Sequence, residues 1–154
     1  MEIVLFDLNG TLCFRDKEER HKITLRPYIE YLYFLKKYYI VGVYTSMMRR
    51  NAMNIISMIE HYCDCNIFDR RYIFCREYTT PFSPEEIIKF NIAPYNTKKS
   101  LASVIGDISK VTIIDDEIFK IVEKERAIII PTFTNVAKDH ELYNIVSILL
   151  DPFC

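Results

Sequence analysis

The sequence predicts an α/β fold in which a mostly parallel central sheet is covered by helices on both faces. Short apolar runs of strand length recur along the chain and alternate with amphipathic stretches of helical period. No internal repeat, low-complexity block or Gly/Ser-rich linker divides the 154 residues, half of which are hydrophobic. A chain of this length can bury a sufficient core without disulfides or a structural metal. We therefore expect residues 1–154 to form a single three-layer domain.

The first expected strand is Glu2–Leu8, an apolar run typical of a strand buried on both faces. The turn residues 9–11 end it, and the dense charges of Arg15–Lys22 favour a solvated loop or hairpin over a basic substrate patch. An apolar stripe over Pro27–Lys37 then predicts a helix, with proline at a favourable first position. The chain thus begins with a strand, an exposed loop and a helix.

A second buried strand is expected at Tyr39–Tyr44, followed by a helix over residues 48–60. The hydroxyl residues Thr45 and Ser46 offer an N-terminal cap for this helix. One face of the helix carries apolar residues at helical spacing: Met48, Ala52, Ile55, Ile56 and Ile59.

The middle of the chain is less regular. Residues 66–78 alternate weakly and indicate a short strand or hairpin. Residues 79–96 contain three of the six prolines and predict an excursion with one helical turn at 85–90, and a short helix is expected at 99–105.

The last third restores the alternation of strands and helices. Buried strands are expected at 111–114 and 127–130, and an amphipathic helix at 138–150. The expected buried face of that helix comprises Leu142, Ile145, Val146 and Leu149.

The charge balance excludes several classes of function. With 20 Lys and Arg against 21 Asp and Glu, the net charge of −1 lacks the basic footprint of direct nucleic-acid binding. No apolar run approaches the roughly 20 residues that a membrane helix needs, and no basic segment precedes the first apolar run as in a signal peptide. We therefore expect a cytoplasmic or nuclear protein that is not secreted. Its Ile, Tyr, Asn and Lys bias fits an AT-rich genome, viral or parasitic.

Five cysteines, an odd number in a chain without a secretion signal, favour reduced thiols. The alternative is a metal site, since four possible ligands lie close together in sequence. Its C-x-C spacing, however, lacks the usual C-x₂₋₄-C loop of such sites. These possible ligands are His61, Cys63, Cys65 and Cys75.

Polar residues gather where the expected strands end. Asp7 lies at the end of the first strand, Thr45 and Ser46 follow the second, and Asp115 and Asp116 follow the third. In open α/β sheets the active crevice lies outside the carboxyl ends of the strands. Each aspartate alone is explained as well by a turn or helix cap. Converging carboxylates, however, repel each other without a cation, and hard oxygen ligands favour Mg²⁺.

The motif Asp7-Leu8-Asn9-Gly10-Thr11-Leu12 resembles the first motif, D-x-D-x-T-[LV], of the haloacid dehalogenase (HAD) superfamily. Within it, the chain is similar to the small phosphatases of the RNA polymerase II carboxy-terminal domain, the NLI-interacting-factor-like phosphatases. The matching segments, in chain order, are Leu25-Arg26-Pro27, Val43-Tyr44-Thr45-Ser46, Phe68-Asp69-Arg70-Arg71, Arg76-Glu77, Lys99-Ser100-Leu101, Asp107-Ile108-Ser109-Lys110-Val111, Ile114-Asp115-Asp116 and Asp139-His140-Glu141-Leu142. The resemblance covers nearly the whole chain and implies an HAD-like fold with a minimal cap.

The resemblance also implies roles for individual residues. Asp7 would be the nucleophile that forms an aspartyl-phosphate. The Asp7 carboxylate, the backbone carbonyl of Asn9 and the acidic pair Asp115-Asp116 would form the Mg²⁺ site. Lys99 would pair with the phosphate or with Asp7 and be oriented by Asp115, although a surface lysine next to Lys98 is the alternative.

Further residues are expected to contact the substrate. Planar guanidinium groups suit phosphate, so two arginines are candidates for substrate binding. The phosphate-binding set is Gly10, Thr11, Thr45, Ser46 and Lys99, and the substrate-binding arginines are Arg71 and Arg76.

Asn9 departs from the family pattern, which has a second aspartate at this position. That aspartate protonates the leaving oxygen and later deprotonates the hydrolytic water, and an amide does neither. Losing a general acid/base typically costs about 10²- to 10⁴-fold in rate. Asp16, Glu18 and Glu19 are the nearby acids that could replace it.

Three functions follow from these observations. The first is a Mg²⁺-dependent phosphoprotein phosphatase-like protein that is impaired by Asn9. Its site is expected to be open, because only the short segments 13–24 and 66–96 are free to cover it. An open site of this kind suits a phosphorylated protein or peptide, such as a Ser/Thr-phosphorylated tail. The second is an inactive pseudophosphatase that binds phosphate or a partner. The third is an HAD enzyme for aryl or acyl phosphates, whose leaving groups need no acid.

Overall fold

The computed structural model covers residues 1–154 and has a five-stranded sheet in the order β5-β4-β1-β8-β9. All four strand pairings are parallel, as the sequence predicts. The strands are β1 (Glu2–Phe6), β4 (Tyr39–Tyr44), β5 (Ile73–Phe74), β8 (Val111–Asp115) and β9 (Ala127–Ile129). The strand order reverses at β1, so the ends of β1 and β8 form the switch point at which α/β sheets bind ligands.

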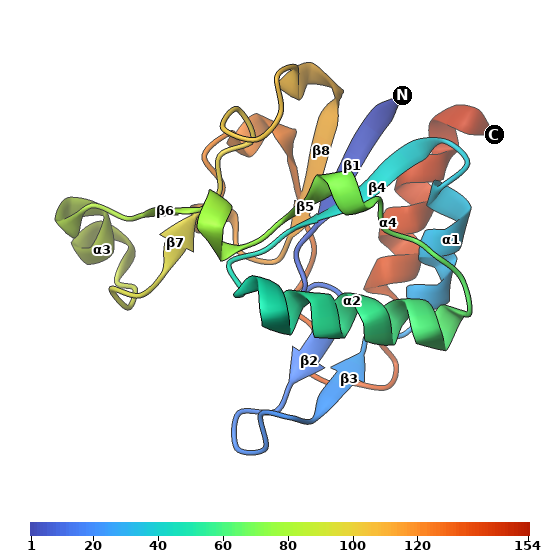
Figure 1. The fold of residues 1–154 in the computed structure, drawn as a ribbon, viewed down its shortest axis with the longest axis horizontal. Coiled ribbons are helices and arrows are strands. Elements are labelled where there is room, and N and C mark those ends of the chain that lie inside the picture. The colour runs from blue at the N-terminus through green and yellow to red at the C-terminus, as the bar shows by residue number, and fades with distance from the viewer.

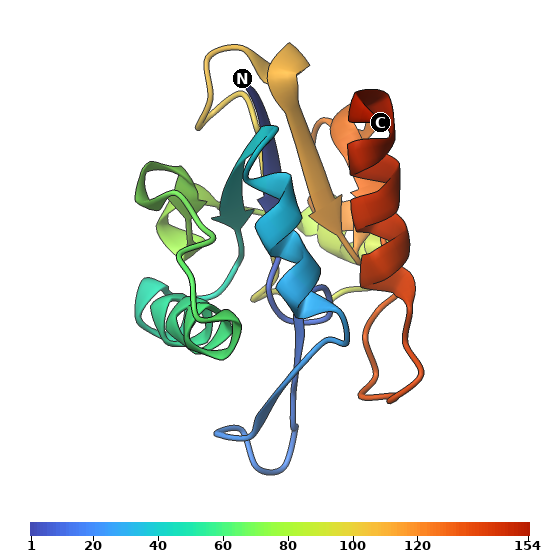
Figure 2. The ribbon, with the colours of Figure 1, turned by 90° about the vertical axis from the view of Figure 1, so that its right-hand side faces the viewer.

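Three helices lie together on one face of the sheet (Figures 1 and 2). These are α1 (Leu32–Leu35), which continues the 3₁₀ turn Ile29–Tyr31, α2 (Arg49–Cys63) and α4 (Glu141–Leu150). Their apolar residues join Val4, Phe6, Val41 and Val43 of the sheet in a core of 25 buried residues. The other face carries a smaller core of 8 residues, which packs Leu5 and Ile113 against Leu101 and Ile121. Irregular chain and 3₁₀ turns, in place of the expected helices, cover this second face.

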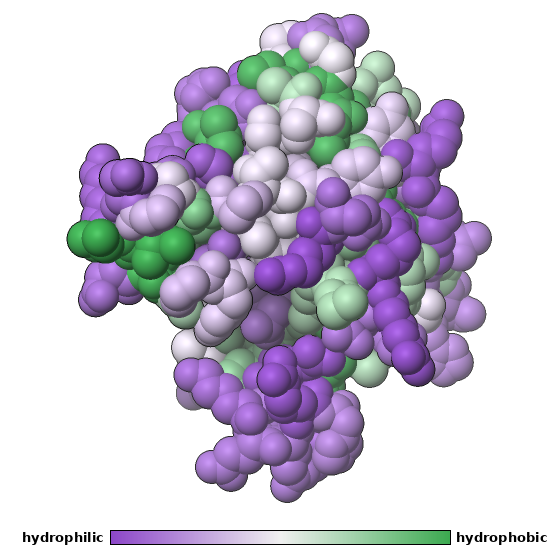
Figure 3. Space-filling model, turned by 60° about the vertical axis from the view of Figure 1, so that its left-hand side comes forward, coloured by the Kyte–Doolittle hydropathy of each residue, from purple (hydrophilic) through white to green (hydrophobic).

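Two small insertions project from the carboxyl edge of the sheet (Figure 1). The hairpin of β2 (Cys13–Arg15) and β3 (Ile23–Leu25) carries the charged segment in its turn. The α3 lobe consists of β6 (Thr80–Pro81), α3 (Pro84–Phe90) and β7 (Thr97–Lys98). Figure 3 shows the hairpin end as strongly hydrophilic, whereas the α3 lobe exposes apolar surface that includes Ile88, 80% exposed.

Several expected element boundaries are wrong. The expected helix at 99–105 does not form, because the Glu123 carboxylate accepts the N–H groups of Leu101 and Ala102 at 2.7 and 3.1 Å. The helix expected from 48 begins at Arg49, with the exposed Met48 as its N-cap and no side-chain cap from Thr45 or Ser46. The helix expected from 27 to 37 shortens to a 3₁₀ turn and one α-helical turn, and the last helix begins at 141 instead of 138.

The alternative metal site at His61 and the cysteines does not assemble. All five cysteines are free thiols, and Asp7, Asp115 and Asp116 are the one group of side chains whose ligand atoms converge closely enough for an ion. None of the helices reaches the length and hydrophobicity that crossing a bilayer requires.

Candidate active site

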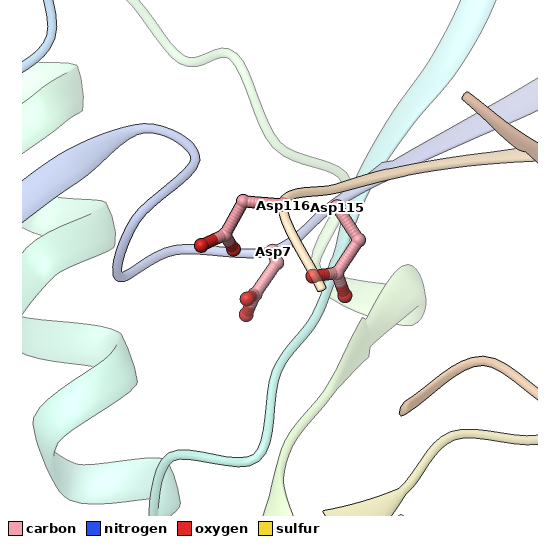
Figure 4. Close-up of side chains that lie close together, drawn as sticks. All are labelled: Asp7, Asp115 and Asp116. Carbon is pink, nitrogen blue, oxygen red and sulfur yellow. The ribbon is translucent and has the colours of Figure 1, made fainter. Parts of the chain in front are cut away.

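Three carboxylates meet at the carboxyl edge of the sheet (Figure 4). Asp7 follows β1, Asp115 ends β8 and Asp116 comes next, and one oxygen of each lies within 4.8 Å of the others. The Asp7 N–H donates to the carbonyl oxygen of Ile114 at 3.0 Å, which extends the β1–β8 ladder to the site. The two central strands therefore fix the three carboxylates relative to one another.

Lys99 lies fully buried between two of these carboxylates, so it is not a surface lysine. Its Nζ is 2.5 Å from Oδ2 of Asp115 and 3.3 Å from Oδ1 of Asp7. The backbone of Lys99 is also held in place. Its N–H donates to the carbonyl oxygen of Lys120 at 2.7 Å, and its carbonyl oxygen accepts from the N–H of Val122 at 2.9 Å. Burial alone would lower the pKa of Lys99, but the two carboxylates outweigh burial and raise it, so the ammonium stays charged.

The cluster nevertheless holds more negative than positive charge. Burial, together with the charge of Asp115, raises the pKa of Asp7 against the opposing effect of Lys99. Burial and the charges of Asp7 and Asp115 raise the pKa of Asp116 to about 7. A hard divalent cation would relieve this repulsion, and an all-oxygen donor set suits Mg²⁺. No backbone N–H donates to the carbonyl oxygen of Asn9, which leaves that oxygen free as the further ligand that the motif predicts.

The loop after Asp7 owes its shape to Gly10. Its φ of +87° lies in the left-handed region, and a Cβ there would overlap the Asp116 carboxylate, with Cγ at 2.8 Å. The Gly10 N–H donates to the Cys13 carbonyl at 2.8 Å, so it is engaged within the loop. Buried Thr11 is likewise engaged, since its Oγ1 donates to Oδ1 of Asp116 at 3.3 Å. Both residues thereby position Asp116.

Thr45 and Ser46 lie at the same edge, directly after β4. Thr45 is buried, and its N–H donates to the Phe74 carbonyl at 2.9 Å, which fixes the backbone beside the carboxylates. Its Oγ1 accepts the N–H of Met47 at 3.2 Å and retains its own hydrogen to donate to a ligand. The Thr45 hydroxyl is therefore available at this edge, and phosphate binding by Thr45 and Ser46 stays a prediction.

Arg26 is a buried positioning residue of this site that the sequence reasoning did not assign. It forms a forked pair with Asp139, from Nε and from an Nη, at 2.9 Å each. Its other donors reach the carbonyls of Gly10 at 3.3 Å, Thr11 at 3.1 Å and Pro131 at 2.7 Å. Arg26 thus ties the first motif to the start of the last helix. The two motifs were visible in the sequence, but nothing local indicated that they pair.

The sequence model of the NLI interacting factor-like phosphatase family matches residues 2–151. The chain belongs to this family. No curated protein matches the sequence significantly.

Two solved structures share the fold of this family member. The fission yeast RNA polymerase II CTD phosphatase Fcp1-R271A bound to beryllium fluoride has a TM-score of 0.62 at 13% identity, covering 90% of this chain and 43% of that one. A structure of Fcp1, described as an essential RNA polymerase II CTD phosphatase, has a TM-score of 0.61 at 15% identity, covering 98% of this chain and 49% of that one. The chain therefore spans less than half the length of both matched structures.

The two arginines expected to bind substrate differ in position. Arg76 lies beside the site, where its Nη atoms donate to the carbonyls of Ser46 at 3.4 Å and Tyr95 at 2.9 Å. Arg71 does not come to the carboxylates: its side chain is 79% exposed and pairs with Asp69 at 2.8 Å. The N–H of Asp69 donates a hydrogen bond to the carbonyl oxygen of Val41, in the middle of β4. This turn therefore lies well before the edge of the sheet that carries the site. Asp69 is only two residues before Arg71, so the ion pair with Asp69 is favoured over a contact with the distant carboxylates.

Asn9, the departure from the family motif, faces an open cleft of about 560 Å³ beside the carboxylates. Its Oδ1 accepts the N–H of Arg15 at 3.2 Å. Of the acids that could replace it, Asp16 accepts two N–H bonds within its own turn, which lower its pKa, and Glu19 pairs with Lys22 at 2.7 Å. Glu18 is exposed and is not among the residues that line the cleft.

Lys120 is a second buried cation near Asp7 that the sequence reasoning missed. It pairs with Glu117 at 3.0 Å, and its charge acts to lower the pKa of Asp7. Its position in the charged segment 117–126 gave no local signal, because burial there depends on the fold.

Proposed function

We propose that this protein is a Mg²⁺-dependent phosphoprotein phosphatase-like protein in which Asp7 is the nucleophile and turnover is limited by Asn9. The observation that carries the proposal is the buried arrangement of Asp7 beside Lys99, with three converging carboxylates. A carboxylate that is fixed by a ladder hydrogen bond and an ammonium group is prepared for in-line attack.

The chemistry has two steps. An Asp7 carboxylate oxygen forms a bond to phosphorus while the bond from phosphorus to the substrate oxygen breaks, which yields an aspartyl-phosphate and an alkoxide that must take up a proton. Water then attacks the phosphorus, releases phosphate and restores the carboxylate. Bound Mg²⁺ would neutralise charge on the phosphoryl oxygens. Lys99 supplies a fixed positive charge, and the Thr45 hydroxyl donates to a phosphoryl oxygen.

Asn9 limits both steps, since its amide neither protonates the leaving oxygen nor deprotonates the water. The engaged side chains of Asp16 and Glu19 support the same conclusion, because neither is free to act as a substitute. We therefore expect turnover of alkyl phosphates to be about 10²- to 10⁴-fold below that of an enzyme with an intact motif. Phosphate and metal binding, which use other atoms, are preserved.

The proposed substrate is a phosphorylated protein segment. The cleft is open, which suits an extended peptide better than a small metabolite enclosed on all sides. The similar Fcp1 structures are of an RNA polymerase II CTD phosphatase, which supports a phosphorylated tail as the substrate class.

A pseudophosphatase is the second candidate, and Asn9 is the observation that favours it. In that case the protein binds a phosphorylated partner and Mg²⁺ without hydrolysing the phosphate.

A burst experiment tests the proposal. We expect purified protein with Mg²⁺ and an aryl phosphate, whose leaving group needs no acid, to form a covalent phosphoenzyme that Asp7→Asn abolishes. Asn9→Asp should raise the turnover of a phosphoserine peptide by about 10²- to 10⁴-fold. A burst without steady turnover on peptides supports the impaired enzyme. Phosphopeptide binding without a burst, and without rescue by Asn9→Asp, supports the pseudophosphatase.

A further inference from the structure

The cleft beside the carboxylates continues away from them onto the β2–β3 hairpin. Its lining combines site residues such as Asn9 and Asp116 with the hairpin cations Arg15, Lys17 and Arg20. Because the two groups line one continuous cleft, a peptide whose phosphoryl group lies at Asp7 would place a neighbouring residue near the hairpin. Successive residues of an extended chain are about 3.3–3.6 Å apart, so a residue one or two positions away would lie about 3–7 Å further along the peptide.

The three hairpin cations have no acidic partners. None of them forms an ion pair with a carboxylate within 4.0 Å, whereas Lys22 in the same turn pairs with Glu19. The Nε of Arg15 is buried and has no hydrogen-bond partner in the protein. Arg15 nevertheless lines the cleft, and a guanidinium group without a carboxylate partner is a suitable donor to an anion.

The acidic groups of the same cleft are already engaged. Asp16 caps its own turn, and Glu117 pairs with Lys120. Asp116 accepts from Thr11 at 3.3 Å and from Thr132 at 2.9 Å, and it belongs to the proposed Mg²⁺ site. Asp16 keeps its negative charge, but the three cations outnumber it, so the net charge that lines the hairpin end of the cleft is positive.

Aromatic rings form part of the same walls. Phe14 and Phe133 line the cleft and contact each other edge to face, with centroids 6.5 Å apart. Apolar walls lower the local dielectric and strengthen an ion pair formed between them. The opposite insertion, the α3 lobe, presents apolar surface instead (Figure 3), so the anion-binding character belongs to the hairpin side.

We propose that the hairpin end of this cleft binds a second anionic group of the substrate, a phosphate or a carboxylate one or two residues from the phosphorylated residue. The proposal rests on the proposed function, since the first phosphoryl group is taken to lie at Asp7. It assigns a substrate class: doubly phosphorylated or acidic phosphopeptides.

Fluorescence anisotropy with labelled peptides and wild-type protein in Mg²⁺ tests this assignment. The peptides carry one phosphoserine and, one or two residues to either side of it, a second phosphoserine, a glutamate or an alanine. We expect a second phosphoserine on one side to lower the Kd about tenfold relative to alanine. A similar gain with glutamate assigns a general carboxylate and phosphate site, and a gain with phosphoserine alone assigns a phosphate site.

Matched variants locate the effect. Arg15→Gln should remove most of the gain and leave the affinity for the singly phosphorylated peptide nearly unchanged. The exposed pair Lys17→Gln/Arg20→Gln serves the same purpose if Arg15→Gln fails to fold, and Lys89→Gln on the α3 lobe is the control that keeps the gain.

Two results would overturn the assignment while the proposed function stands: equal affinity for the singly and doubly anionic peptides, or a gain that survives the hairpin variants. Failure of every phosphopeptide to bind would instead refute the proposed function, and this assignment with it.

Discussion

Two buried charge clusters lie within a few residues of each other along the motif loop, and they differ in balance. Around Arg26 one cation meets one carboxylate, Asp139, and the remaining guanidinium donors reach backbone carbonyls. Around Asp7 three carboxylates lie near two buried lysines: Lys99 pairs with Asp7 and Asp115, whereas Lys120 pairs with a further carboxylate, Glu117.

This difference in charge balance distinguishes a cluster that stabilises the fold from one that can bind a ligand. A buried cluster whose charges and hydrogen bonds are all matched needs no ligand and holds segments together. A cluster with more carboxylates than cations is stable only if a carboxylate takes up a proton or a cation binds, as the raised pKa values of Asp7 and Asp116 indicate. The excess of carboxylates at Asp7 therefore indicates a candidate cation-binding site.

The largest expected effect comes from breaking the balanced cluster. Arg26→Met leaves the Asp139 carboxylate without its partner and should lower the free energy of unfolding by about 3–5 kcal/mol. Urea unfolding measures the loss. The matched control is Arg71→Met, which breaks a similar forked pair with Asp69 on the surface and should cost less than about 1 kcal/mol. Equal losses in the two variants would contradict the assignment of Arg26 to the core.

The unbalanced cluster should respond to Mg²⁺. At a concentration about 100 times its Kd, Mg²⁺ should stabilise the fold by about 2.7 kcal/mol, and EDTA should reverse this. Thermal unfolding with and without the ion measures it. Asp116→Asn should reduce the effect and Asp16→Asn, outside the cluster, should keep it. A Mg²⁺ effect that is identical in both variants would place the ion elsewhere.

A second balanced cluster, at Glu60, should show its contribution through pH. Its carboxylate accepts the N–H groups of Ile67 and Phe68 at 2.8 and 3.0 Å and pairs with Arg70 at 2.5 Å. Burial alone would raise the pKa of Glu60, but these partners outweigh burial and lower it below its usual 4.5. The stability that it adds is therefore present above pH 4.5 and is lost as the pH falls through the lowered value.

Glu60→Gln should accordingly cost about 1–2 kcal/mol at pH 7, and the difference from wild type should shrink steadily below pH 4.5. Urea unfolding over a pH series measures it, with Glu77→Gln in the exposed pair with Arg49 as control. A difference that grows on acidification would have the wrong sign for this cluster.

The smallest expected effect is the sharpest contrast with Arg26. Asp7→Asn removes one of the competing carboxylates, so without Mg²⁺ at pH 7 the stability should stay the same or rise by up to about 1 kcal/mol. The same variant should lose the phosphoenzyme. A destabilisation above about 2 kcal/mol would show instead that Lys99 depends on Asp7 for its charge balance.

The sequence was sufficient for the sheet and for the convergence of the three carboxylates. Continuous apolar runs mark strands buried on both faces, so β4 agrees with its predicted range and β1 and β8 differ only at their ends. The acidic trio followed from the rule that strand ends in such sheets meet at one edge. Asn9 could be identified as a departure from the motif because the residues on either side of it match the motif.

What failed depended on contacts distant in sequence. The helix expected at 99–105 is replaced by hydrogen bonds to Glu123, more than twenty residues away. The partner of Arg26 lies 113 residues further along the chain. Arg71 was assigned to the substrate although an acid two residues before it offers a closer partner. Periodicity reports local preference and does not identify which distant group competes for a hydrogen bond.

The two insertions at the carboxyl edge form ladders of their own. β2 pairs with β3 and β6 pairs with β7, and neither ladder joins the central sheet. The hairpin turn at residues 16–22 can therefore be exchanged for a segment of different length or charge without rewiring the strands that hold Asp7 and Asp115. Under the proposed function, grafting the hairpin turn of another family member would therefore be a direct route to change the choice of peptide while the strands that carry the carboxylates stay the same.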